Sequence, residues 1–435
     1  MELLKTLSQA WKVEELRKKI LFTLMMLVVY RIGSNIPVPG INRAYLSQMF
    51  SGETGLLDLF DLFSGGSFSN FTIFALSITP YVTASIIVQL LTIALPYFER
   101  LSKEGNEGHK KMATITRYMT VVLGLIQAIG LTVGLFKNAV VDKSAFASIT
   151  IIMVLTAGTV FLMWLGEQIN EYGIGNGISL IIFAGIVDRF PTFVRNTYAQ
   201  VSEGAISGVA VLTLLIVSVM LVMVIILFEQ GVRKIPVQYA KKMQGRKMVG
   251  GQSTNIPLKV NTAGVIPVIF ASSLMSFPNV IASLLGKTGG TGIGSKIMTG
   301  LSQSSWCDPS RPIYSLGLVL YIVLVVFFAY FYTSITFNPI EISNNMKRQG
   351  GFIPGIRPGK PTTEYLSRIL NYIVFIGAVG LIIVCVIPIF FNGMFGANVS
   401  FGGTSIIIIV GVVLETLKQI ESQMLVRYYK GFLND

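Results

Sequence analysis

The sequence is poor in the residues on which most enzymes depend. Its 435 residues include one histidine, His109, and two cysteines, Cys307 and Cys385, whose separation matches no zinc or redox motif. No phosphate-binding loop motif occurs, and the glycines of segment 173–177 lack the spacing and preceding strand of a dinucleotide fold. These absences argue against catalysis and predict neither a metal nor a cofactor. We expect His109 to be solvated and Cys385 to be a buried thiol, although a disulfide stays open from the sequence.

Charged residues are also scarce, at 13% against 52% hydrophobic residues and a mean hydropathy of +0.68, values typical of a membrane protein. Within the apolar spans, Asp, Glu and Lys occur only near the ends, as at Asp188 and Glu415. Ion-coupled transporters usually carry intramembrane ionisable groups. The pattern therefore favours a passive conduit that is driven by a partner.

Two other classes of protein stay open. One is a small-molecule secondary transporter with broken helices, against which the lack of midplane charge counts. The other is an intramembrane enzyme, against which the single histidine and the lack of paired carboxylates count. A saturable solute flux would favour the first class, and hydrolysis that depends on polar residues would favour the second.

The apolar runs predict an all-α polytopic membrane protein with about ten transmembrane helices, because about 20 apolar residues span the hydrocarbon core. The predicted spans are 20–38, 72–95, 118–136, 146–166, 174–190, 206–228, 262–285, 313–336, 369–391 and 402–420.

A broken helix is predicted within residues 56–96. There a short amphipathic piece, Gly65-Gly66 and a Ser/Asn-rich stretch precede a charge-free apolar span. Backbone exposed to lipid cannot leave its helix at membrane depth, because each unpaired peptide group costs several kcal/mol there. The break is therefore expected inside the protein or along a water-filled cavity, as in a pore with a movable element.

Most of the 34 lysines and arginines fall on one side of the predicted spans, which places both termini in the cytoplasm. The net charge of +13 suits anionic membrane lipids. Two long basic loops on that side, 229–261 and 337–368, also contain many Gly and Pro residues. Loops of this length and charge favour an acidic partner, such as ribosomal RNA or an acidic protein surface.

Five regions in register carry a specific resemblance. FSNFTIFALSITPYVTASIIVQLL (68–91) closely resembles the second-helix signature of the SecY/Sec61-alpha family of protein-conducting channels. Segments 164–186, 252–273, 350–362 and 401–408 resemble, in order, that family's second signature, its two cytoplasmic-loop regions and the start of its last helix. The resemblance runs from about residue 10 to the C-terminus, and the loops are similar to those of the bacterial SecY branch.

The resemblance implies two inverted pseudo-symmetric halves around an hourglass pore. A lateral gate would open to lipid between helix two and helices seven and eight. The expected parts are an amphipathic N-terminal segment (1–19), a first half (20–190) with a plug (60–72), a hinge (191–205), a second half (206–420) with the two cytoplasmic loops, and a cytoplasmic tail (421–435).

Aligning the signatures also implies a pore constriction of aliphatic side chains. Its members are Ile78, Val82, Ile178, Ile182, Ile269 and Ile408. The first two pairs are spaced i, i+4, so each pair projects from one face of its helix. Any one of these residues could instead be an ordinary core residue, so the set depends on the alignment.

Three further sets follow from the same alignment. The plug would contain Leu62, Phe63, Gly65, Gly66, Ser67, Phe68, Ser69 and Asn70, with the glycines as hinge and the small serines permitting close packing without a deep energy well. The lateral gate would contain Thr83, Gln89, Ser272, Ser273 and Phe277. Cytoplasmic partners would meet Arg246, Lys247, Lys347, Arg348 and Arg357.

The implied function is that of the central subunit of a protein translocase in the bacterial plasma membrane. It would pass unfolded, signal-bearing precursor polypeptides across the membrane and release hydrophobic segments sideways into lipid. The implied partners are the small subunits SecE and SecG, the motor ATPase SecA and the ribosome.

Overall fold

The computed structural model describes most of the chain. The described residues are 11–42, 45–46, 64–136, 139–142, 144–202, 208–239, 242–244, 247–249, 253–284, 297, 299–301, 306, 312–395 and 403–431. The predicted plug residues Leu62 and Phe63, the basic residue Arg246 and Cys307 lie outside this part. His109 is exposed and Cys385 is a buried free thiol, as predicted.

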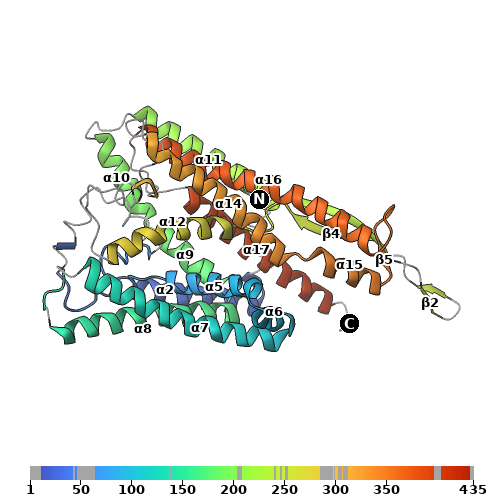
Figure 1. The fold of residues 1–435 in the computed structure, drawn as a ribbon, viewed down its shortest axis with the longest axis horizontal. Coiled ribbons are helices and arrows are strands. Elements are labelled where there is room, and N and C mark those ends of the chain that lie inside the picture. The colour runs from blue at the N-terminus through green and yellow to red at the C-terminus, as the bar shows by residue number, and fades with distance from the viewer. Residues whose placement is uncertain are drawn as a thin grey trace.

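The first half of the chain is a group of helices that occupies the lower part of Figure 1. It contains α2 (Glu14–Gly33), α5 (Thr79–Ala94), α6 (Pro96–Lys103), α7 (Asn106–Ile129), the π-helix η1 (Gly130–Leu135), α8 (Ala145–Tyr172) and α9 (Gly177–Asp188). The helix α10 (Phe190–Ser202) follows α9 and fills most of the segment predicted as a hinge.

The second half forms the upper part of the molecule (Figure 1). Its helices are α11 (Gly208–Gln230), α12 (Ile266–Leu284), the 3-10 helix η3 (Pro312–Ser315), α14 (Leu316–Thr336), α15 (Pro339–Arg348), α16 (Lys360–Phe395) and α17 (Gly403–Gly431). Each of the ten predicted apolar spans therefore overlaps a helix.

Several of these helices have the length and apolar composition needed to cross a bilayer. Among the described residues, six are long and apolar enough, and a seventh span is formed if α5 and α6 count as one helix bent by 98°. The bend begins at Pro96, whose preceding residue Leu95 is extended, as is usual before proline. The chain is a mainly helical, multi-pass membrane protein.

The helix predicted from residue 72 begins only at Thr79. Residues 65–78 form turns joined by one isolated bridge, and the non-glycine residues Phe71 and Ser77 have φ angles of 45° and 53°. Pro80 lies in the first turn of α5, where its missing N–H costs nothing. The predicted break in the apolar run is therefore present, and it extends further along the chain than hydropathy indicates.

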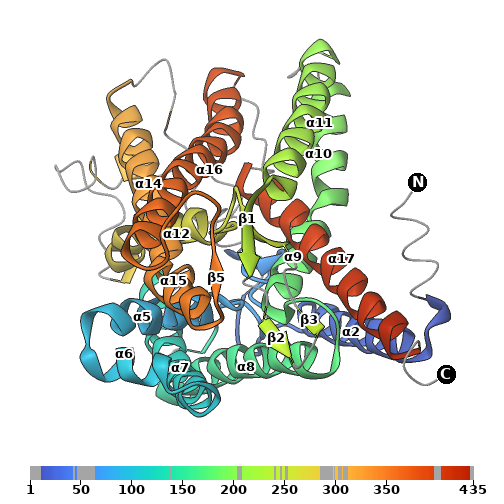
Figure 2. The ribbon, with the colours of Figure 1, turned by 90° about the vertical axis from the view of Figure 1, so that its right-hand side faces the viewer.

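The two long basic loops form one folded unit, which we call the platform (232–259 with 339–366). A three-stranded sheet in the order β4-β1-β5 joins β1 (Val232–Tyr239) and β4 (Ser253–Lys259) to β5 (Gly351–Phe352). A two-stranded hairpin, β2 (Lys242–Gln244) with β3 (Lys247–Val249), extends from its tip. The strands, α6, α15 and the C-terminal end lie at one end of the molecule, seen end-on in Figure 2.

The buried apolar side chains form separate clusters in the two halves of the chain, at their junction and in the platform. One cluster fills the second half around Tyr321, Phe270 and Phe328. A second, the outer cluster, lies in the first half around Phe71 and Phe136. A third, the central cluster, contains residues of both halves and is the subject of the next subsection. The platform has a core of its own.

Candidate functional site

The six residues predicted for the constriction all belong to the central cluster. Ile78, Ile182 and Ile408 are fully buried there, with exposed fractions of 2%, 7% and 2%. The other three, Val82, Ile178 and Ile269, are half-buried and pack against them. They come from α5 and its N-terminal cap, α9, α12 and α17. Residues from distant parts of the chain thus meet where the two halves join.

Local sequence explains how α9 presents its two residues. Asn176 caps the helix, since its side-chain oxygen accepts from the N–H groups of Ile178 and Ser179 at 3.2 and 3.4 Å. The helix therefore starts at Gly177, and Ile178 and Ile182 lie one turn apart on one face. Gly166 of α8 lets Ile178 approach closely, because a Cβ there would lie 3.3 Å from Ile178 Cγ1.

The described part of the predicted plug, residues 64–72, is tightly folded. Gly65 and Gly66 have positive φ angles of 62° and 85°, which glycine adopts without strain. Ser67 is fully buried, and Ser69 Oγ and the Asn70 N–H both donate to the Gly66 carbonyl, at 3.1 and 3.2 Å.

Aromatic packing also holds this segment. The rings of Phe68 and Phe71 lie 5.6 and 4.8 Å from that of Phe136, both edge-on. The Phe71 carbonyl accepts from the Val38 N–H at 3.0 Å. Residues 64–72 are therefore closely packed, and the phenylalanines between and after the serines anchor the segment in the outer cluster.

Replacing Gly65 by alanine should release this segment from α9. A Cβ at Gly65 would lie 2.7 Å from the Cα of Gly185, whereas at Gly66 its nearest neighbour is an Asn70 side-chain atom at 4.0 Å. Both alanines would pay about 1 kcal/mol for a left-handed backbone, but only Gly65→Ala adds overpacking of about 1–3 kcal/mol. Labelling of a Ser67→Cys thiol, with Cys307 replaced by serine, should be about tenfold faster in Gly65→Ala than in Gly66→Ala. Equal labelling rates would refute this account of the docking.

The residues predicted for the lateral gate lie on α5 and α12. Thr83 donates its hydroxyl to the Thr79 carbonyl of its own helix at 3.0 Å, and Gln89 is half-buried on the same helix. Ser272 is half-buried on α12. Ser273 is half-buried, and the side chain of Phe277 lies outside the described part. That these residues face one another across the lateral gate stays a prediction.

The described contact between α5 and the second half is apolar. Ile86 of α5 packs against the core of the second half, and η1 lies against α12. Ile86 follows Ile78 and Val82 at intervals of four residues, so it continues the same stripe on the helix. That spacing is the sequence signal that could have identified it.

The platform places three of the predicted partner-binding residues on its surface. Lys347 and Arg348 end α15, Arg357 follows β5, and all three side chains are exposed. Lys247 lies in β3, and its side chain is outside the described part. Beneath them, Ile235, Val237, Leu258 and Leu366 form a buried apolar core, so the exposed charges are carried on a folded support.

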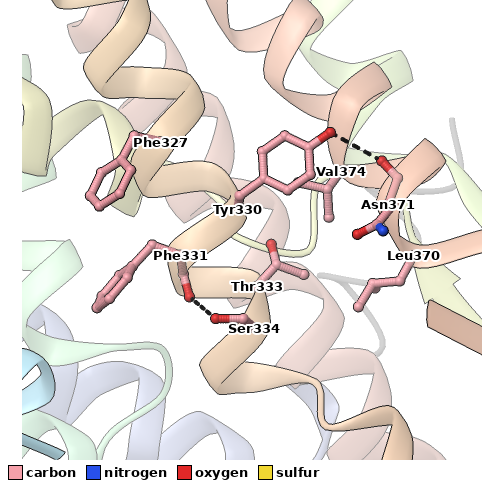
Figure 3. Close-up of a pocket in the computed structure, with 8 residues that line it drawn as sticks. All are labelled: Phe327, Tyr330, Phe331, Thr333, Ser334, Leu370, Asn371 and Val374. Atoms are coloured by element: carbon pink, nitrogen blue, oxygen red, sulfur yellow. Dashed lines mark hydrogen bonds between the residues drawn. The ribbon is translucent and has the colours of Figure 1, made fainter. Parts of the chain in front are cut away.

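A separate groove of about 480 Å3 lies between α14 and α16 (Figure 3). It is lined by Phe327, Tyr330, Phe331, Thr333, Ser334, Leu370, Asn371 and Val374. The Tyr330 hydroxyl donates to the Asn371 carbonyl at 3.4 Å, and Ser334 donates to the Phe331 carbonyl at 2.7 Å. None of the predicted site residues lines this groove, so it is distinct from the central cluster.

Comparison with known proteins decides the family. The SecY family profile matches residues 72–417, which include all six constriction residues. The chain belongs to the SecY family. It is 45% identical over 444 residues to the Protein translocase subunit SecY of Halalkalibacterium halodurans, with 99% of both chains covered. The SecY of Streptomyces galbus is 46% identical, with 99% of this chain and all of that protein covered, and that of Bacillus subtilis is 44% identical at the same coverage.

Solved structures of the SecY/Sec61 fold are also similar. One, described as "The structure of a protein conducting channel", has a TM-score of 0.68 at 20% identity and covers 94% of this chain and 92% of its own. Another, described as "Sec61 in the Canine ribosome-channel complex from the endoplasmic reticulum", has a TM-score of 0.63 at 19% identity with the same coverage. These matches show that the helices are arranged as in the channel fold.

Proposed function

We propose that the chain is the channel-forming subunit of a Sec protein translocase. It passes unfolded secretory polypeptides across the membrane and releases hydrophobic segments into lipid. The observation that carries this function is the central cluster, where aliphatic residues from both halves meet in a chain whose relatives are SecY subunits. A hydrophobic segment leaving sideways gains about 25 cal/mol per Å2 of apolar surface that it buries.

The six constriction residues form the pore ring in this proposal. A ring of branched aliphatic side chains closes a narrow passage by excluding water from it. Such a ring makes no fixed hydrogen bonds, so an extended polypeptide of any sequence slides past without being held. Residues 60–72 form the plug, and α5 meets α12 and α14 at the lateral gate.

The platform serves as the docking surface for a cytoplasmic partner. Its exposed Lys347, Arg348 and Arg357 suit the acidic surface of a ribosome or of the motor ATPase SecA. The small subunits SecE and SecG complete the complex. The membrane is the bacterial plasma membrane, and both termini lie in the cytoplasm, on the same side as the platform.

Import into proteoliposomes tests this function. Vesicles would contain the chain with SecE and SecG, and SecA, ATP and a signal-bearing precursor would be added outside. We expect ATP-dependent protection of the precursor from protease, and none for a precursor that lacks its signal. A verified, folded complex that protects no precursor would overturn the translocase function and favour solute transport.

A further inference from the structure

The turn between α8 and α9, residues 173–176, is held from both halves of the molecule. From the first half, the Thr23 hydroxyl oxygen accepts from the Ile174 N–H at 2.9 Å. From the second half, Gln419 Oε1 accepts from the Gly175 N–H at 2.6 Å. Buried peptide groups need such partners, because an unpaired one costs about 1–3 kcal/mol. We call the bond between Gln419 and Gly175 the latch.

The latch depends on a close approach of α17 to the backbone of the turn. Gly175 has a φ of 89°, and a Cβ at this position would lie 2.8 Å from Leu180 Cδ1 and 3.0 Å from Thr416 Oγ1. A glycine is therefore needed both for the backbone conformation and for the space. Leu16, Ile174 and Ile420 form a small buried cluster beside the latch, so it is shielded from water on that side.

The two segments joined by the latch, α17 and the turn that leads into α9, also contain residues of the pore ring. On α17, Ile408, Val412, Thr416 and Gln419 follow one another at intervals of three or four residues and therefore share one face. Ile408 and Val412 belong to the central cluster. On the other side, α9 begins directly after the turn and carries Ile178 and Ile182.

Because a helix is stiff over three turns, a bond at Gln419 limits how far Ile408 can slide or rotate against α9. Figure 2 shows α17 running down beside α2 to the same end of the molecule. At the opposite seam, by contrast, α5 reaches the core of the second half through Ile86. The latch thus lies on the side where the halves are held by both polar and apolar contacts.

We propose that Gln419 is a positioning residue for the closed channel. Its bond to the Gly175 N–H sets the register of α17 against α9, and thereby places Ile408 against Ile178 and Ile182. This inference rests on the pore ring proposed above. When the acceptor is removed, the buried Gly175 N–H loses its partner, and α17 shifts until water or another group satisfies it.

Substitutions that differ only in the acceptor test the latch. Gln419→Met keeps the length of the side chain and removes the oxygen, whereas Gln419→Glu keeps an oxygen that accepts the bond. The control is Gln423→Met, one turn further along α17, where the side-chain oxygen meets Lys19 Nζ at a longer 3.4 Å. Resting ion leak is measured in proteoliposomes that contain the chain with SecE and SecG.

The leak of Gln419→Met should exceed that of the control by about two- to tenfold, which corresponds to a net hydrogen bond of about 0.5–1.5 kcal/mol. Gln419→Glu should leak as little as the unchanged protein. A helix that was merely destabilised would not be rescued by the carboxylate. Equal leak in Gln419→Met and Gln423→Met would overturn the inference.

A second measurement separates the latch from the ring. Cysteines are placed at Ile182 and Ile408 with Cys307 replaced by serine and Cys385 by alanine, and a short thiol cross-linker is added. The cross-linking yield should fall in the Gln419→Met background and stay unchanged in Gln423→Met. A leak-tight Ile408→Asn channel would reject the pore ring but not the latch. Unchanged cross-linking in Gln419→Met would reject the latch, regardless of the result for the pore ring.

Discussion

Replacing Ile182 and Ile408 by asparagine is expected to make the closed channel leak ions while precursor import continues. Both side chains are buried in the central cluster, and each loses about 2–3 kcal/mol of apolar burial on substitution. The amides also favour water in the constriction, so both the lost apolar burial and the added polar groups destabilise the water-free closed state. Import continues because the ring excludes water and does not hold the polypeptide. We expect the resting ion flux of proteoliposomes to rise by at least about tenfold.

A buried isoleucine outside the ring provides the control. Ile151 is 1% exposed and belongs to the outer cluster. Ile151→Asn imposes a similar cost on the fold without touching the central cluster, so its vesicles should stay tight. A tight Ile182/Ile408 double variant with normal import would keep the translocase function and reject the pore ring. A leak of equal size in Ile151→Asn would assign the leak to general loosening of the helices.

Replacing Gly158 by alanine is expected to remove most of the folded protein. This glycine of α8 faces the backbone of the turn before α5, and a Cβ there would overlap the Ile73 carbonyl and lie 3.4 Å from Phe74 Cδ1. Backbone cannot move aside as a side chain can, so the overpacking costs about 3 kcal/mol or more. That is a large share of the 5–15 kcal/mol that stabilises a typical domain. The amount of monodisperse protein in fluorescence-detected size exclusion should fall accordingly.

Gly124 offers a matched substitution on the neighbouring helix α7. Its nearest contact would be Thr159 Cγ2 at 3.8 Å, an ordinary van der Waals distance. Gly124→Ala should therefore leave the yield unchanged, or raise stability slightly through better helix propensity. If both alanines lowered the yield equally, the close approach at Gly158 would not be the cause.

Hydropathy predicted which segments form helices but not all of their ends. The span predicted over 146–166 is α8, extended by nearly two turns to Tyr172, because the polar residues that follow Trp164 remain helical. The span predicted from residue 72 was wrong at its start. Residues 72–78 are as apolar as α5, so composition cannot show that they form turns. The positive φ angles of Ser77 and of Phe71, just before this segment, depend on tertiary contacts that a single sequence does not display.

The residues of the candidate site were also predicted from the sequence only in part. The aligned signatures brought together the residues that meet in the central cluster, because helix periodicity and family motifs both specify faces. Contacts that depend on how the two halves pack, such as Gln419 with the Gly175 N–H, were not predictable from spacing. In the platform, alternation of Ile235 and Val237 in β1 was a strand signal, but the loop's Gly, Pro and charge obscured it.

The shared sheet of the platform also constrains the order in which the chain can fold during synthesis. Gln238 of β1 pairs with Phe352 of β5, and the helices α12 and α14 are made between these two residues. Until the ribosome has passed α15 and β5, β1 has an open edge, and Ile235 and Leu258 lack the cover of Met346 and Leu366. Exposed strand edges and apolar patches are where nascent chains aggregate. A chain that stalls after α14 should therefore be a substrate for membrane proteases, although most of its apolar spans are already made.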